Sequence, residues 1–356
     1  MNFDDLNINE NILRGIYSYG FEKPSQIQLQ SIPIILEGTD IIAQAQSGTG
    51  KTGAFAIGSL CNIDLNLKQT QVLILLPTHE LVNQVLSVIE EFSKFLNIQV
   101  IKLIGGTSVI QSLSELDKNP EIIIGTPGRV LDMISKNKVN TMYIKTLVFD
   151  EADEILSYGF KETIYNIVNR IPKNTQICIF SATIPSDILE LTNKFMNEPI
   201  KILIKNEELT LEGIQQFYIP VKHNDWKYDI IKYLYDIINI NQCIIYINTK
   251  KKVLDIFNRL NVDSFPVSYI TSDRTSQERK EIMDDFRSGK IRILLTTDLL
   301  SRGIDIQQLS LVINYDIPRE KEVYIHRIGR SGRYGRKGIA INLINDKELT
   351  DLQFIE

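Results

Sequence analysis

The stretch T146LVFDEADEIL156 places an apolar, β-rich run directly before a cluster of acidic residues. The run suits a strand that is buried on both faces of a sheet, because no polar residues alternate with its apolar ones. Asp150, Glu151 and Asp153 follow within four positions. Three carboxylates this close repel one another unless a positive charge lies nearby. The stretch therefore predicts a buried strand that ends at a site for a cation.

Runs of the same kind recur along the chain, separated by segments long enough for helices. They lie at residues 40–43, 72–76, 121–125 and 176–180, and then at 243–247, 291–298, 311–316 and 338–344. This alternation is typical of α/β proteins with parallel sheets, which bind ligands beyond the carboxyl ends of their strands. The polar segment 205–213 separates the two series. We therefore expect an N-terminal domain over residues 1–204, a linker over 205–213 and a C-terminal domain over 214–356.

The composition is that of a soluble globular protein. Of the 356 residues 43% are hydrophobic, and no run approaches the roughly 20 apolar residues that cross a bilayer. Cys61, Cys178 and Cys243 are isolated, and three histidines are too few for a structural zinc site. We expect a reduced compartment, the cytoplasm, or the host cytoplasm if the protein is viral. The net charge of −5 argues against a protein that is covered all over with basic residues for nucleic-acid binding. Residues 326–338 nevertheless form a local basic segment.

A glycine-rich loop follows the first predicted strand, in QAQSGTGKTGAFAIGSL from Gln44. Gly48 and Gly50 allow a tight turn that points backbone amides at an anion, and the next helix adds its dipole. Lys51 can reach the β and γ phosphates, and the Thr52 hydroxyl can hold Mg²⁺. A glycine turn that merely caps an ordinary helix is the alternative, but Lys-Thr between a strand and a helix favours a phosphate site.

Nucleotide-bound magnesium is the cation that the acidic cluster needs. Asp150 would hold it, commonly through water. Glu151 would orient or deprotonate the attacking water, while Asp153 lies beyond the likely ligands. Without the glycine-rich loop, an acidic helix N-terminus would explain these carboxylates equally well.

The tetrapeptide Asp150-Glu151-Ala152-Asp153 resembles the signature of the DEAD-box ATP-dependent RNA helicases. Other blocks follow in the family's order: GFEKPSQIQ from Gly20, PTHEL from Pro77, GG at Gly105, TPGR from Thr126, SAT from Ser181, TTDLLSRGID from Thr296 and HRIGRSGR from His326. Segments between these blocks are similar to family members that act in translation initiation. The resemblance covers essentially the whole chain, and it implies two tandem RecA-like domains that use ATP and Mg²⁺.

The resemblance also implies roles for residues around the nucleotide. Gln28 would read the adenine edge and Phe21 would stack on the base, although both Phe21 and its supporting Phe3 could simply pack in the core. The remaining nucleotide contacts that it implies come from Ser47, Gly48, Thr49, Gly50, Gly303 and Asp305. Ser181 and Thr183 would hydrogen-bond Asp153 and so couple hydrolysis to RNA, although Ser-Ala-Thr alone is only a helix N-cap signal.

In the second domain, the resemblance makes Arg330 and Arg333 fingers that stabilise charge on the γ phosphate. His326 and Arg327 would hold that segment in place. The alternative interpretation is that residues 326–333 form only a general basic patch. The RNA contacts that it implies are Thr78, Gly106, Thr126, Arg129, Arg279, Thr297 and Arg302. These residue types suit phosphates and 2′-hydroxyls, so we expect binding without sequence specificity.

Some positions depart from the family pattern. His79 stands where the family usually has arginine, which weakens an expected phosphate contact. Thr271, Ser272 and Ser276 alter the expected RNA surface of the second domain, but the ATP site is unaffected. Because the chain ends at Glu356, we also expect a C-terminal helix of the family to be missing or replaced.

We therefore expect an ATP-dependent RNA helicase in which ATP and RNA close a cleft between two domains and hydrolysis reopens it. The protein would act as a monomer, possess no membrane anchor and work with translation-initiation scaffold proteins. One alternative is an ATP-gated RNA clamp in a larger assembly, with little unwinding. Another is a nucleotide-binding regulator with weak catalysis.

Overall fold

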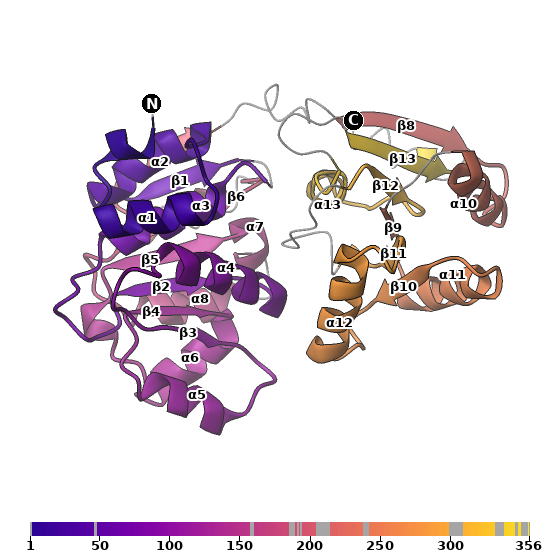
Figure 1. Cartoon of the computed structure of the whole chain (residues 1–356). Helices are drawn as coiled ribbons and strands as arrows, with labels where there is room; N and C mark the ends of the chain where they lie inside the picture. Colours follow the sequence, from indigo (N-terminus) through magenta and orange to yellow (C-terminus); the bar gives the residue numbers. More distant parts are fainter. Residues whose placement is uncertain are drawn as a thin grey trace. The chain divides into compact units, whose positions relative to one another are not determined.

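The computed structural model describes residues 2–45, 48–156, 160–184, 189–190, 192, 194–203, 214–237, 242–298, 309–331, 338–345, 348–349 and 355. The chain divides into two compact units, residues 1–209 and 210–356, each built around one parallel β-sheet (Figure 1). Two α/β domains were expected, and this fold class is confirmed. The expected linker, residues 205–213, lies outside the described residues. In the part of the chain that is described, no helix is both long and apolar enough to span a bilayer.

The first unit contains a seven-stranded sheet in the order β3-β4-β2-β5-β6-β1-β7. Its strands are β1 (Ile41–Gln44), β2 (Val72–Leu75), β3 (Val100–Leu103), β4 (Ile122–Gly125), β5 (Thr146–Asp150), β6 (Gln176–Ser181) and β7 (Ile200–Leu203). Its described helices are η1 (Phe3–Leu6), α1 (Glu10–Ser18), α2 (Gln26–Leu36), α3 (Lys51–Cys61), α4 (His79–Phe92), α5 (Val109–Leu116), α6 (Pro127–Ser135), η2 (Thr141–Tyr143), α7 (Ala152–Ile155) and α8 (Lys161–Val168).

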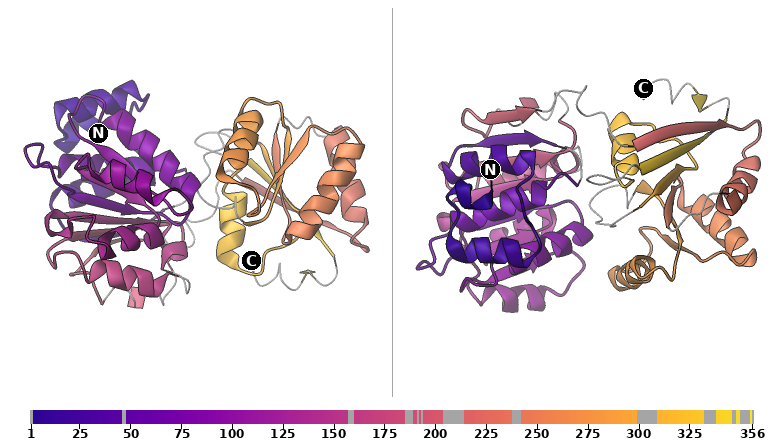
Figure 2. Two further views of the ribbon diagram at one scale, coloured as in Figure 1. Left: turned by 90° about the horizontal axis from the view of Figure 1, so that it is seen from below. Right: turned by 45° about the horizontal axis from the view of Figure 1, so that its top comes forward.

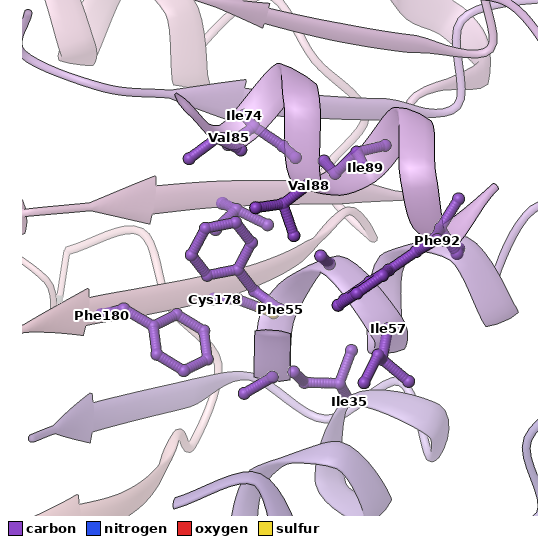
Figure 3. Packing of buried hydrophobic residues seen from close by; sticks show 14 of the residues in the cluster. Ile35, Phe55, Ile57, Ile74, Val85, Val88, Ile89, Phe92, Cys178 and Phe180 are labelled. Atoms are coloured by element: carbon purple, nitrogen blue, oxygen red, sulfur yellow. The ribbon is translucent and has the colours of Figure 1, made fainter. Parts of the chain in front are cut away.

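Side chains along the central strands alternate between two apolar layers. Val148 and its equivalents pack with α1–α4 on one face of the sheet, whereas Phe149 and its equivalents pack with α6–α8 on the other. Figure 3 shows the first layer, where Phe55 of α3 and Phe92 of α4 lie among aliphatic side chains. Phe55 also meets Phe180 of β6, with ring centroids 5.4 Å apart. Packing on both faces leaves only the strand ends open to a ligand.

The second unit contains a six-stranded sheet in the order β10-β11-β9-β12-β13-β8. Its strands are β8 (Ile214–Pro220), β9 (Cys243–Tyr246), β10 (Val267–Ile270), β11 (Ile293–Thr296), β12 (Leu311–Asn314) and β13 (Gly338–Ile344). Its described helices are α10 (Trp226–Ile237), α11 (Lys250–Val262), α12 (Ser276–Arg287) and α13 (Lys321–Ile328). Helices α10 and α11 cover one face of the sheet and α12 lies on the other (Figure 2). Core residues of these helices pack in two separate clusters, one on each face.

Helix starts follow from local capping chemistry. The Thr78 side chain accepts a hydrogen bond from the Leu81 backbone N–H at the start of α4. At the start of α12, Thr275 and Glu278 form a reciprocal capping box. Such caps satisfy backbone N–H groups that the first turn of a helix leaves open. The loops that precede these helices lie at the carboxyl ends of strands, where the candidate functional residues are found.

Candidate functional site

The glycine-rich loop between β1 and α3 depends on two left-handed residues. Gly48 has φ of 83° and Gly50 has φ of 100°, values that residues with a Cβ rarely adopt. Space imposes a second requirement, because a Cβ on Gly50 would lie 2.6 Å from Nε2 of Gln28. Gly50 caps α3, which begins at Lys51. The loop thus delivers a helix N-terminus to the end of β1, and helix N-termini bind anions. Ser47 lies outside the described residues.

Lys51 is a buried cation at this helix start. Only 6% of its surface is exposed, and within the described part of the chain its Nζ has no hydrogen-bond partner. A buried ammonium group without such a partner is costly, so the position favours an anionic ligand. Thr52 follows it on α3 and is partly exposed. Lysine and a hydroxyl at a helix start fit the phosphates and the magnesium ion of a nucleotide.

Asp150, the last residue of β5, is 4% exposed. Burial, assisted by the neighbouring charge of Glu151, raises the pKa of Asp150 to about 7, while the charge of Lys51 acts in the opposite direction. A bound cation strongly stabilises a carboxylate whose pKa is raised in this way, because the cation favours its charged form. Asp150 therefore fits the expected role of a magnesium ligand.

Glu151 has an uncommon backbone conformation. Its φ of 50° and ψ of 53° are left-handed, and it caps the short helix α7. Its backbone N–H donates to Oδ1 of Asp150 at 3.0 Å. For a residue with a Cβ this conformation costs roughly 1–2 kcal/mol, and such strain is concentrated at functional sites. Nothing in the sequence signals this turn.

The three residues assigned to coupling in the first unit lie together. Thr183 Oγ1 donates to Oδ2 of Asp153 at 2.7 Å, and the Asp153 backbone N–H donates to Ser181 Oγ at 3.3 Å. All three are buried. They connect α7, which follows the acidic cluster, with the end of β6.

Gln28 joins α2 to the glycine-rich loop. Its Oε1 accepts from the Ser25 backbone N–H at 2.9 Å, and its Nε2 donates to the Gly50 carbonyl at 3.0 Å. The side chain is 2% exposed. Each of these polar atoms keeps one further bonding position, so the amide can recognise a base while it braces the loop. The contact between Gln28 and Gly50 could not be predicted from the sequence.

Phe21 belongs to a cluster of aromatic rings and remains partly exposed. Phe3 stacks parallel to it with centroids 6.3 Å apart, and Phe3 itself is fully buried. Tyr19 and Phe92 meet the Phe21 ring edge to face at 5.4 Å and 5.6 Å. These three rings fix the plane of Phe21. Tyr19 and Phe92 were missed in the sequence, where only an apolar period marks Phe92 as a core residue.

A pocket of about 400 Å³ opens at the carboxyl ends of β2, β3 and β4. Its lining consists of Pro77, His79, Gly105, Thr126, Gly128, Arg129, Asp132 and Phe160. Thr126 and Arg129 are therefore brought together, next to the exposed Gly106 (φ 71°) and close to Thr78 at the start of α4. His79 faces the glycine pair, with its ring within 4 Å of where a Cβ on either glycine would lie.

Arg129 is already held by its own unit. Its guanidinium donates to Thr107 Oγ1 at 3.2 Å, to the Thr107 carbonyl at 2.8 Å and to Ser112 Oγ at 2.7 Å. These bonds tie α6 to the loop that contains Gly106. Arg129 thus orients the loop in addition to any direct contact with a phosphate, a role that the sequence did not indicate.

In the second unit, α13 positions the basic segment. Arg327 is fully buried and donates to Asp298 Oδ1 at 2.6 Å, the Asp316 carbonyl at 2.7 Å and Asn248 Oδ1 at 2.7 Å. His326 is also buried, whereas Arg330 is partly exposed and its Nε donates to the His326 carbonyl at 3.4 Å. Arg327 therefore anchors the helix, and Arg330 follows at its end.

The other expected residues of the second unit follow the paired ends of β10 and β11, lie in the first turn of α12, or lie outside the described part. Thr297 follows β11 and Arg279 lies in the first turn of α12, and both are partly exposed. Thr271 is buried, and within the described residues its Oγ1 has no hydrogen-bond partner. Ser272 is exposed, and Ser276 begins α12. The expected residues Arg302, Gly303, Asp305 and Arg333 lie outside the described residues.

Two family models match the chain. One, described as DEAD/DEAH box helicase, matches residues 25–191, and the other, described as helicase conserved C-terminal domain, matches residues 226–335. The proteins named ATP-dependent RNA helicase eIF4A from Meyerozyma guilliermondii and Candida albicans are 52% and 53% identical to the chain over 354 residues. The match covers 99% of this chain and 89% of each relative.

Solved structures with the same fold include Saccharomyces cerevisiae Dbp5 bound to RNA and ADP BeF3. Its TM-score is 0.92 at 34% identity, covering 99% of this chain and 92% of that one. A DEAD box protein from the hyperthermophile Methanococcus jannaschii is 37% identical, with a TM-score of 0.60, and covers 100% of this chain and 96% of its own.

Proposed function

This chain belongs to the DEAD-box family and is an ATP-dependent RNA helicase of the eIF4A type, and from that premise we propose which residues carry out each step. Lys51 binds the β and γ phosphates of ATP at the N-terminus of α3. Thr52 and Asp150 hold Mg²⁺, which neutralises phosphate charge when bound. Phe21 and Gln28 take the adenine base, with Phe21 held in plane by its aromatic neighbours.

The observation that carries this assignment is the buried Lys51 ammonium group, whose Nζ has no hydrogen-bond partner in the described part of the chain. Nearby, burial and the charge of Glu151 raise the pKa of Asp150 to about 7. Anionic phosphates satisfy the lysine, and a divalent cation satisfies the carboxylate. Both unfavourable charges are thereby offset by one ligand, Mg²⁺-ATP.

Glu151 orients or deprotonates the attacking water, a role that suits a buried carboxylate next to the magnesium ligand. Arg330 and Arg333 of the second unit stabilise the charge that develops on the γ phosphate. The hydrogen bonds among Asp153, Ser181 and Thr183 couple the bound nucleotide to the loops that bind RNA. RNA phosphates and 2′-hydroxyls bind at Thr78, Gly106, Thr126 and Arg129 in the first unit and at Arg279, Thr297 and Arg302 in the second.

The wider setting is also a proposal, supported by the similarity to relatives named eIF4A. We expect a monomer that works in the cytoplasm in translation initiation and is recruited by scaffold proteins. An ATP-gated RNA clamp is the second candidate, because the same closure could hold RNA without unwinding it. Displacement of a strand from a short RNA duplex, with ATP against a non-hydrolysable analogue, separates the two.

The test of the ATP site is RNA-stimulated phosphate release by Lys51→Ala. No other described residue offers a cation to this helix start, so turnover should fall to background. Lys118→Ala, which removes an exposed lysine paired with Glu115 at 2.8 Å, is the matched control and should keep wild-type turnover. Wild-type turnover in Lys51→Ala would rule out the proposed phosphate site.

A further inference from the structure

Helix α10 in the second unit presents apolar side chains to solvent as well as to its core. Tyr228 and Ile231 are buried against the sheet. On another face, Trp226, Tyr233 and Ile237 are 49%, 66% and 59% exposed. An ordinary surface helix shows polar residues there. These exposed residues are therefore unexplained by the fold of the unit.

The exposed residues follow a regular spacing. Trp226, the half-buried Ile230, Tyr233 and Ile237 occupy positions i, i+4, i+7 and i+11, which align along one side of a helix. We call these four residues the α10 stripe. The spacing is the one by which two helices pack side by side through alternating apolar positions. Tryptophan and tyrosine are also among the residues most enriched in protein interfaces.

Acidic residues border the α10 stripe. Asp229 and Asp236 are exposed, stand seven positions apart, and each precedes an isoleucine of the stripe. Neither forms an ion pair in the described part of the chain. The nearby Lys232 pairs with Asp263 at 2.6 Å and attracts both carboxylates without forming an ion pair with either. The border is therefore a row of negative charge parallel to the apolar residues.

We propose that the α10 stripe docks an amphipathic helix of a partner protein, with apolar side chains at the same spacing and Lys or Arg along one border. The apolar spacing requires a helix, and the carboxylates at positions 229 and 236 require basic residues opposite them. This contact lies on an element that carries no part of the proposed ATP or RNA sites.

Other occupants fit less well. RNA and anionic lipid surfaces would bring negative charge against the acidic border. A second copy of the chain would place like charges along the same border. The exposed apolar area is also on the order of a few hundred Å², against roughly 800 Å² per partner in a stable dimer. One docked helix, in a contact that forms and dissociates readily, matches this area.

The chain offers a direct probe of the α10 stripe, because Trp226 is its only tryptophan. Two synthetic helical peptides of about 20 residues, free of tryptophan, would carry leucine at the stripe spacing. One would have lysines along its border and the other glutamates. With the full chain, the lysine peptide should give a saturable blue shift of tryptophan fluorescence, and the glutamate peptide should bind at least about tenfold more weakly.

Variants separate the apolar part from the charged part. Ile237→Asp should weaken binding of the lysine peptide by about tenfold or more. Ile110→Asp, which changes a 79% exposed isoleucine of the first unit, is the matched control and should bind normally. Asp229→Lys with Asp236→Lys should reverse the preference, so that the glutamate peptide binds more tightly. RNA-stimulated ATP hydrolysis should stay unchanged in Ile237→Asp, so this test is independent of the proposed catalytic roles.

Several results would overturn the proposal. Equal binding of both peptides would show that the acidic border does not select basic residues. An equal loss of binding in the Ile110→Asp control would show that the α10 stripe is not the binding site. A dimer in sedimentation analysis that Ile237→Asp dissolves would make a second copy the occupant. A Trp226 response to oligouridine or to phosphatidylcholine vesicles, abolished by the same variant, would assign the α10 stripe to RNA or to lipid.

Discussion

Thr183 Oγ1 donates a hydrogen bond to Asp153 Oδ2 at 2.7 Å, and both side chains are buried. The bond joins the segment after β6 to α7, which begins next to Glu151. A buried carboxylate oxygen that loses such a partner pays a desolvation cost of about 1–3 kcal/mol. The position of one segment is therefore linked energetically to that of the other.

Thr183→Ala should impair duplex unwinding more than RNA-stimulated ATP hydrolysis, because it breaks this link but leaves Lys51, Asp150 and Glu151 in place. Unwinding and phosphate release would be measured on the same preparation. Thr183→Ser keeps the hydroxyl and should restore unwinding. A parallel fall of both activities in Thr183→Ala would mean that the bond supports the catalytic site itself.

Asp150→Asn should stabilise the nucleotide-free protein in a pH-dependent way. Because its pKa is raised to about 7, the Asp150 carboxyl binds a proton more tightly in the folded chain than in the unfolded one. Its ionisation therefore lowers the free energy of unfolding as pH rises from about 4 to about 7, and the cost is fully present above that range. The variant should be more stable than wild type by roughly 1–3 kcal/mol at pH 8 and by less at pH 5.

Urea unfolding between pH 5 and pH 8 measures this difference, with Asp132→Asn as a control, because that carboxylate is partly exposed and pairs with Lys136 at 2.8 Å. Magnesium-dependent ATP hydrolysis by Asp150→Asn should be lost. A stability difference that does not change with pH would show that Asp150 carries no such ionisation cost.

His79→Arg should tighten RNA binding and steepen its dependence on salt. His79 lines the pocket beside Gly105 and Thr126, and arginine would add a permanent charge there. Each added phosphate contact steepens the logarithmic salt slope by roughly 0.7 for single strands. RNA titrations at several salt concentrations measure the slope. His223→Arg adds the same charge at an exposed site of the second unit, so an equal change in both variants would exclude a local contact at position 79.

Two arginines of the second unit should behave differently. Arg330→Ala should reduce RNA-stimulated turnover by about 10³-fold or more with little effect on ATP affinity, because a charge-stabilising arginine acts mainly in the transition state. Arg327→Ala should instead destabilise the unit by roughly 3–5 kcal/mol, since it leaves the partners of a buried cation unsatisfied. Single-turnover kinetics and urea unfolding separate these effects. Normal turnover in Arg330→Ala would remove it from the catalytic set.

Among the strands that the structure describes, the sequence by itself identified every interior strand of both sheets but none of the edge strands. Each predicted run corresponds to β1, β2, β4, β5, β6, β9, β11, β12 or β13, which have neighbours on both sides. The missed strands β3, β7, β8 and β10 are the four edges. Interior strands are buried on both faces and give continuous apolar runs. An edge strand such as β8, where Phe217 and Tyr218 are more than half exposed, carries a mixed sequence without that pattern.

The nucleotide loop could also be predicted from the sequence, because its glycines, Lys51 and Thr52 are contiguous and act through the local backbone. Only the tertiary structure decided that Gln28 braces Gly50, that Arg129 is held by Thr107 and Ser112, and that Glu151 adopts a left-handed turn. These relationships join residues that are far apart in the chain or depend on strain imposed by the surrounding packing. A local pattern specifies backbone turns and buried faces, whereas the partner of a polar side chain is chosen by which elements the folded core brings beside it.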